Sequence, residues 1–123
     1  MSFSLVASLG MVLCGFFGLA GLLAPEEIMA PYGITGWNAG TLLIARLWGV
    51  LFIFLAANLA AVRTCTDREL QSRFSKYAAA SNALAAAVAA HGVLIGSGNA
   101  LLWSSVALFV FFTVAFGNIG LRR

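Results

Sequence analysis

The chain has 123 residues and a formal charge of +3; 62% of its residues are hydrophobic and only 9% are charged. Soluble globular domains carry about 25% charged residues, so this composition excludes a soluble protein and predicts one all-α domain within a membrane. The longest run of bases is the pair Arg122-Arg123, so the positive charge does not indicate a nucleic-acid partner. We expect it to mark the orientation of the membrane spans instead.

The first apolar run covers residues 2–23 and predicts one membrane-spanning helix. It lacks the positively charged start of a secretory signal, so we expect it to be retained. Small residues recur along the run at steps of 3, 4, 4 and 3, which places them on one helix face. We expect this face to pack closely against another helix, with a ligand groove as the alternative. The small residues are Ala7, Gly10, Cys14, Gly18 and Gly21.

The first connection contains two acids and no base. Pro25 suits the first turn of a helix, and Glu26 and Glu27 suit its positively polarised beginning. We therefore expect a short interfacial helix over about 25–30, ended by Pro31.

The second span is expected at about 39–63, with Asn38 as its N-cap. It contains Arg46, the one charge placed deep within an apolar segment. An ionisable side chain inside a span is a candidate functional residue, and its partner has to be sought among the other polar residues.

The second connection holds many of the charged residues of the chain. Thr66 followed by Glu69 has the pattern of a capping box, and Glu69 with Arg73 forms an i,i+4 pair. The third helix should therefore begin near Asp67 in water, with its membrane-spanning part at about 76–95. This part is rich in alanine, which is typical of a helix held among neighbouring helices.

The fourth span is expected at about 100–121, after a tight turn at 96–99. Cys14 and Cys65 lie in different surroundings, one within a span and one in a charged connection, so we expect two free thiols. On the inner side of the bundle, Asn58 and Asn82 should lie at similar depth and are expected to hydrogen-bond across helices.

The positive charges outside the spans predict the threading. Six bases fall in the second connection and at the C-terminus, and none falls in the other two connections. The positive-inside rule then predicts an antiparallel four-helix bundle with both termini on the cytoplasmic side, or on the matrix or stromal side in an organelle. The membrane is expected to be a bacterial inner membrane or an organelle membrane. The six bases are Arg63, Arg68, Arg73, Lys76, Arg122 and Arg123.

This threading gathers several polar residues near the outer surface. Arg46 should lie about seven residues, roughly 10 Å, inside the second span, and His91 should lie at similar depth in the third. The first connection would place an acid above them, so we expect the Arg46 guanidinium to turn into the bundle toward a glutamate or a backbone carbonyl. The alternative is that Arg46 reaches the headgroups and His91 bonds a neighbouring carbonyl. The candidate cluster is Arg46, His91, Glu26, Glu27 and Trp103, with Asn99 nearby.

The sequence contains no signature of a metalloprotease, serine hydrolase, phosphate-binding loop or dithiol centre. We therefore expect a non-enzymatic accessory or scaffold subunit of a larger membrane complex, with other integral membrane subunits as partners. The alternative is a stand-alone membrane protein that binds a hydrophobic molecule, such as a lipid, quinone, sterol or pigment, near Arg46 and His91. A tetrapyrrole ligated by His91 is one form of that alternative.

The string Ala45-Arg46-Leu47-Trp48-Gly49, with Pro25-Glu26 and Tyr32-Gly33 before it, resembles the small four-helix DoxX-like membrane proteins. The chain is also similar to the four-helix ergosterol-biosynthesis scaffold protein, which has Ala-Arg-x-x-Gly in a span and a later histidine. The first resemblance implies a bundle of four spans and no single activity, and the second implies a scaffold role.

Overall fold

The computed structural model describes residues 1–121, and these residues form helices and connections without a β-strand. Four helices are long and apolar enough to cross a membrane, which confirms the predicted all-α architecture with four spans. The elements are α1 (Phe3–Leu23), α2 (Pro25–Met29), the 3₁₀ turn η1 (Ala30–Tyr32), α3 (Ala39–Val62), α4 (Arg68–Leu94), the 3₁₀ turn η2 (Ala100–Leu102) and α5 (Trp103–Leu121).

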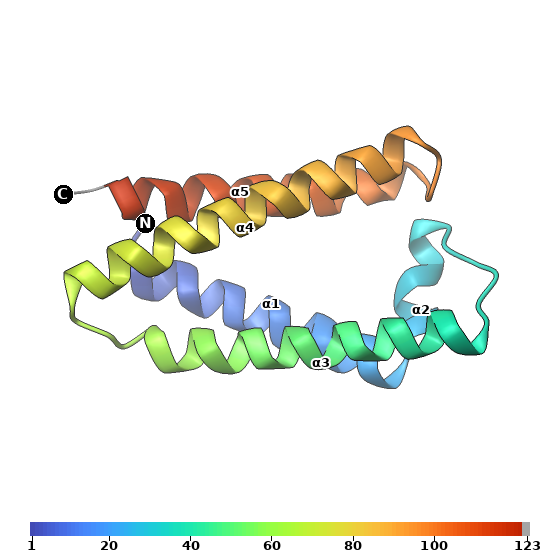
Figure 1. Ribbon diagram of the computed structural model, residues 1–123, viewed down its shortest axis with the longest axis horizontal. Coiled ribbons are helices and arrows are strands. Elements are labelled where there is room, and N and C mark those ends of the chain that lie inside the picture. The colour runs from blue at the N-terminus through green and yellow to red at the C-terminus, as the bar shows by residue number, and fades with distance from the viewer. Residues whose placement is uncertain (122–123) are drawn as a thin grey trace.

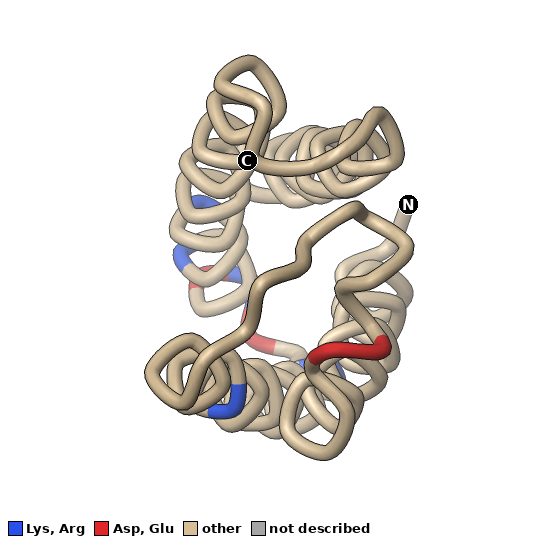
Figure 2. Tube along the Cα trace, turned by 90° about the vertical axis from the view of Figure 1, so that its right-hand side faces the viewer, with Lys and Arg blue, Asp and Glu red and all other residues tan. Residues whose placement is uncertain are grey.

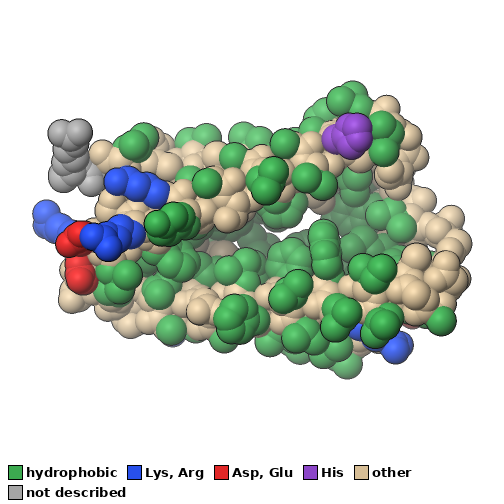
Figure 3. All heavy atoms as spheres, viewed as in Figure 1, with side chains coloured by type: hydrophobic (Ala, Val, Ile, Leu, Met, Phe, Trp, Pro, Cys, Tyr) green, Lys and Arg blue, Asp and Glu red, His purple; other side chains and the backbone are tan. Residues whose placement is uncertain are grey.

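The four long helices form two antiparallel pairs, α1 with α3 and α4 with α5 (Figures 1 and 2). The start of α1, the α3–α4 connection and the end of α5 all lie at one end of the molecule (Figure 1). Basic side chains gather at this end (Figure 3), which we call the basic end. The first and third connections lie at the opposite end. The arrangement agrees with the predicted threading, in which both termini share a side.

Glycines let α1 and α3 approach closely. A Cβ added at Gly49 would lie 2.5 Å from the Leu22 backbone nitrogen and 2.7 Å from the Gly18 carbonyl oxygen. Gly21 faces the same stretch of α3, and Gly10 faces Leu59. The predicted small-residue face of the first span is therefore a helix-packing face, because side chains larger than hydrogen would separate the two backbones.

The α4–α5 pair is also closely packed near the basic end. The Ser72 hydroxyl donates to the Gly120 carbonyl oxygen at 2.9 Å, and a Cβ at Gly120 would lie 3.1 Å from the Lys76 backbone nitrogen. Ser75 is fully buried on α4, and its hydroxyl has no hydrogen-bond partner within residues 1–121.

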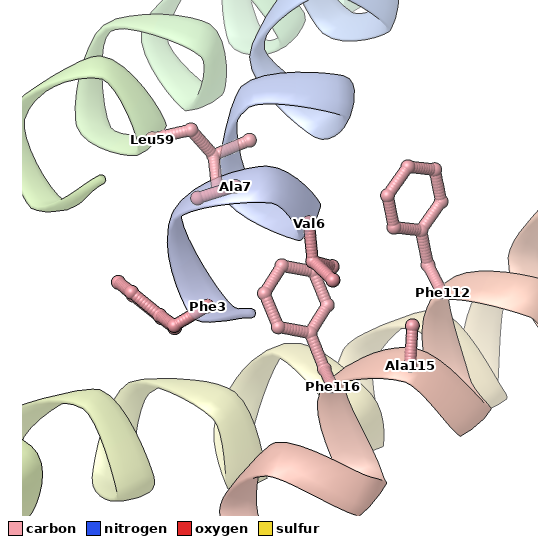
Figure 4. Packing of buried hydrophobic residues seen from close by; sticks show 7 residues of the cluster. All are labelled: Phe3, Val6, Ala7, Leu59, Phe112, Ala115 and Phe116. Carbon is pink, nitrogen blue, oxygen red and sulfur yellow. The ribbon is translucent and has the colours of Figure 1, made fainter. Parts of the chain in front are cut away.

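The two pairs meet in a hydrophobic core that lies toward the basic end (Figure 4). Val6 of α1 points toward Phe112 and Phe116 of α5, whose rings stack with centroids 6.0 Å apart. Aromatic contacts continue through Phe74 of α4 to Phe3 of α1. The buried members are Phe3, Val6, Ala7, Leu59, Phe112, Ala115 and Phe116.

A second junction joins the pairs at the opposite end. The Asn99 backbone N–H donates to the Tyr32 carbonyl oxygen at 2.8 Å, and its side-chain amide donates to the Pro31 carbonyl oxygen at 2.8 Å. A Cβ at Gly98 would lie 2.9 Å from the same Tyr32 oxygen, so only glycine fits this approach without movement. These contacts between η1 and the turn before η2 fasten the first connection to the third.

Several helix boundaries differ in detail from prediction. Asn38 caps α3 as expected, and Thr41 completes a capping box with it. The predicted capping box of Thr66 with Glu69 is wrong, because Asp67 is the residue that caps α4, accepting from two backbone N–H groups. Its carboxylate accepts from the N–H groups of Glu69 and Leu70, so the N-cap is one residue later than the predicted Thr66. The Glu69–Arg73 pair is confirmed.

Pro31 does not simply end the short interfacial helix. The α-helical turns cover Pro25–Met29, and Pro31 lies inside the 3₁₀ turn that follows. The fourth span likewise begins with a 3₁₀ turn at Ala100–Leu102, capped by the Asn99 side chain. Arg122 and Arg123, two of the six bases used to predict the threading, lie outside the described residues.

Candidate functional site

The two acids of the first connection lie in the first turn of α2, as predicted. Glu26 and Glu27 are both exposed, and neither accepts a hydrogen bond or ion pair from another side chain in the part of the chain that the structure describes. Their position at a helix N-terminus stabilises the negative charge without a basic partner.

Arg46 does not meet these acids. Its side chain is exposed on α3, and across residues 1–121 it makes no hydrogen bond and no ion pair, so the expected turn into the bundle is not formed. The reason is helix geometry. Ala45 and Gly49 face α1, and Arg46 follows Ala45 at about 100° around the helix, away from that contact.

The other candidates of the outer cluster are also apart. His91 is exposed in the last turn of α4, and its ring makes no hydrogen bond within residues 1–121. Trp103 is 46% exposed at the start of α5. Of the polar residues predicted near this end, Asn99 alone makes the long-range contacts described above, and its role there is to join the two connections.

A groove hollows the bundle between the helix pairs (Figure 3). It lies between α3 and α4, with α5 as its floor, and has a volume of about 270 Å³. The Trp48 and Phe52 rings pack edge to face on its α3 wall, 5.6 Å apart. Its lining residues are Trp48, Leu51, Phe52, Leu55, Ser81, Asn82, Ala85 and Phe109. We call this hollow the α3–α4 groove.

The α3–α4 groove exists because these two helices do not pack together along their length. Toward the basic end, the space between the pairs is filled by Leu59 and Phe112. One or two turns further along, Leu55 and Phe109 line an open space instead. Neither Arg46 nor His91 lines this groove.

Asn82 is the polar side chain of the groove that is partly buried. Its amide donates to the Ala78 carbonyl oxygen of its own helix at 2.8 Å. Asn58 does the same toward Phe54 at 2.8 Å, so the predicted bond between Asn58 and Asn82 is not formed. Each amide reaches a carbonyl one turn back, which satisfies one N–H without a second helix.

A smaller hollow of about 140 Å³ lies beside α5, lined by Met1, Phe111, Val114, Ala115 and Asn118. The residues 1–121 bring together no group of three or more His, Cys, Asp or Glu side chains that could hold a metal ion. Both cysteines are free thiols, as predicted.

Comparison with protein-family models, with curated proteins and with solved structures found no match to this chain. The resemblance to DoxX-like proteins and to the ergosterol-biosynthesis scaffold therefore stays a prediction, and the arrangement of the helices is the basis for the function proposed below.

Proposed function

We propose that this protein is a non-enzymatic accessory or scaffold subunit of a larger membrane complex, in a bacterial inner membrane or an organelle membrane. One observation carries the proposal: the least apolar of the four spans is also the least buried. In the apolar stretch of α4, 6% of the residues are buried, compared with 11% in α3, 17% in the fourth span and 22% in α1. Lipid is a poor environment for such a helix, whereas neighbouring helices suit it.

The exposed surface of α4 has the composition of a helix-packing face. Ala80, Ala83 and Ala87 are all exposed and follow one another at steps of 3 and 4, which places them on one side of the helix. We call them the α4 face. Leu84 and Val88 are exposed beside these alanines, but α3 exposes more large side chains, such as Leu47 and Phe54. Large apolar side chains suit lipid, and small ones suit the close approach of another helix.

Purification of the tagged full chain in mild detergent tests the proposal. A partner held through the α4 face should co-purify at fixed stoichiometry and should be lost from an Ala83→Phe variant, because the larger ring separates the helices. Ala57→Phe is the matched control, since Ala57 is exposed on α3 and lies six residues before Arg63, as Ala83 lies seven residues beyond Lys76. Loss of the partner from both variants, or recovery of a partner-free wild-type protein from its native membrane, would contradict the proposal.

The second function, binding of a hydrophobic molecule by the protein alone, is supported by the α3–α4 groove and not by contacts around Arg46 and His91. A quinone or pigment held there would be detected by absorbance and by mass spectrometry of the purified protein. The chemistry of the groove and its surroundings favours a lipid acyl chain over a quinone or pigment as its occupant.

A further inference from the structure

We infer that the α3–α4 groove holds an acyl chain of an anionic phospholipid, whose headgroup lies among the bases of the basic end. This inference needs no partner protein and so does not depend on the accessory role.

The α3–α4 groove is held open from both sides. Toward the basic end the helix pairs are separated by the rings of Phe112 and Phe116. At the opposite end, Asn99 fastens the first connection to the third. The groove therefore cannot close by a simple approach of α3 to α4. An open space at this depth in a bilayer has to be filled by an apolar chain, because water is excluded from the hydrocarbon.

The groove runs from the leaflet at the basic end to beyond the middle of the bilayer. Of the lining residues, Asn82 lies six residues beyond Lys76, Leu55 lies eight residues before Arg63, and Trp48 lies fifteen residues before Arg63. At 1.5 Å per residue these separations are roughly 9, 12 and 22 Å along the helices. Half of the hydrocarbon core is about 15 Å thick, so an acyl chain from that leaflet reaches the groove and enters it sideways between α3 and α4.

The charges at the basic end select the headgroup. Glu69 is already paired with Arg73, and the Asp67 carboxylate caps α4. Arg63, Arg68 and Lys76 form no ion pair within residues 1–121. These three positive charges lie where the headgroups of the same leaflet lie. Together with Arg73 they outnumber the two acids at this end, Asp67 and Glu69, by two. A phosphate with a net negative headgroup supplies the missing charge, whereas a zwitterionic headgroup brings its own cation.

Fluorescence quenching reports lipid near the groove, because Trp48 lines it; Trp48 is also 55% exposed, so surrounding lipid contributes to the signal and the variants below separate the two. The other two tryptophans, Trp37 and Trp103, are replaced by phenylalanine so that Trp48 alone reports. The protein is reconstituted in phosphatidylcholine vesicles that contain the same mole fraction of either phosphatidylglycerol or phosphatidylcholine with brominated acyl chains. We expect stronger quenching by brominated phosphatidylglycerol, with roughly a fivefold preference per participating base.

Two variants separate the groove from lipid that merely surrounds the protein. Ala85→Phe fills the groove from its α4 wall and should abolish the preference, while Ala83→Phe, the same change on the exposed face of α4, should retain it. Circular dichroism checks that each variant is folded. If Ala85→Phe does not fold, Arg63→Gln combined with Lys76→Gln decides, because it leaves the groove intact and should remove most of the preference.

Equal quenching by the two brominated lipids in the protein with Trp48 alone would overturn the inference. A preference that survives Ala85→Phe or the double glutamine change would also overturn it. Since the purified chain is measured alone, loss of a protein partner has no effect on these outcomes.

Discussion

Replacing Gly49 by alanine tests the closest contact in the molecule. The added Cβ would lie 2.5 Å from the Leu22 nitrogen, 2.7 Å from the Gly18 oxygen and 2.9 Å from the Gly21 carbonyl carbon. All three atoms belong to the α1 backbone, so no side chain can rotate away. Relief requires the helices to separate by about 1 Å, and a gap of this size loses a quarter to a half of the dispersion energy of each contact that it opens.

Overpacking of this kind typically costs about 1–3 kcal/mol. The matched control is Gly15→Ala on α1, where an added Cβ has no atom within 4 Å. Both substitutions gain about 1 kcal/mol of helix propensity, so the difference between them isolates the contact. We expect Gly49→Ala to be about 2 kcal/mol less stable than Gly15→Ala, which is roughly a 30-fold change in the unfolding equilibrium.

The assay is reversible unfolding in mixed detergent micelles by increasing fractions of dodecyl sulfate, followed by circular dichroism. Equal unfolding curves for the two variants would refute the argument that backbone contact between α1 and α3 requires glycine at position 49.

Four further predictions follow from individual contacts. Asn99→Ala should lower the free energy of unfolding by about 2 kcal/mol and speed amide exchange in the first connection, as measured by mass spectrometry, because it removes both the bond to Pro31 and the cap of η2. A cysteine placed at Ser97 and the native Cys65 should react with an impermeant maleimide from opposite sides of the membrane, and labelling from one side would refute the threading. Arg46→Lys should change unfolding in the micelle assay by less than about 0.5 kcal/mol, because Arg46 makes no hydrogen bond within residues 1–121; a larger loss would indicate a bound partner. Ser75→Ala should leave stability unchanged or raise it by about 1 kcal/mol in the same assay, because the Ser75 hydroxyl is buried without a partner among the described residues.

The sequence by itself determined the elements and much of their packing. Apolar length alone locates four spans, since a helix is the form in which a single segment satisfies its backbone groups in lipid. The steps of the small residues in the first span identify the face that meets α3, and Asn38 marks the start of that helix. The bases outside the spans predict that the termini and the second connection share one end, and the start of α1, this connection and the end of α5 lie together there (Figure 1).

Only the tertiary structure decided which faces meet and which stay open. The helical period places Arg46 and Ala45 on different faces of the second span. Which face meets α1 is decided by the close packing of Ala45 and Gly49 against that helix, and this packing leaves Arg46 pointing outward. In the same way, Asn82 was recognised as polar, yet its bond to its own helix and its place in the α3–α4 groove follow from how far the pairs stand apart. In water, burial would decide which apolar face turns inward. In a bilayer lipid also solvates apolar faces, so close backbone contact and hydrogen bonds between connections make that choice, and these depend on residues far apart in the chain.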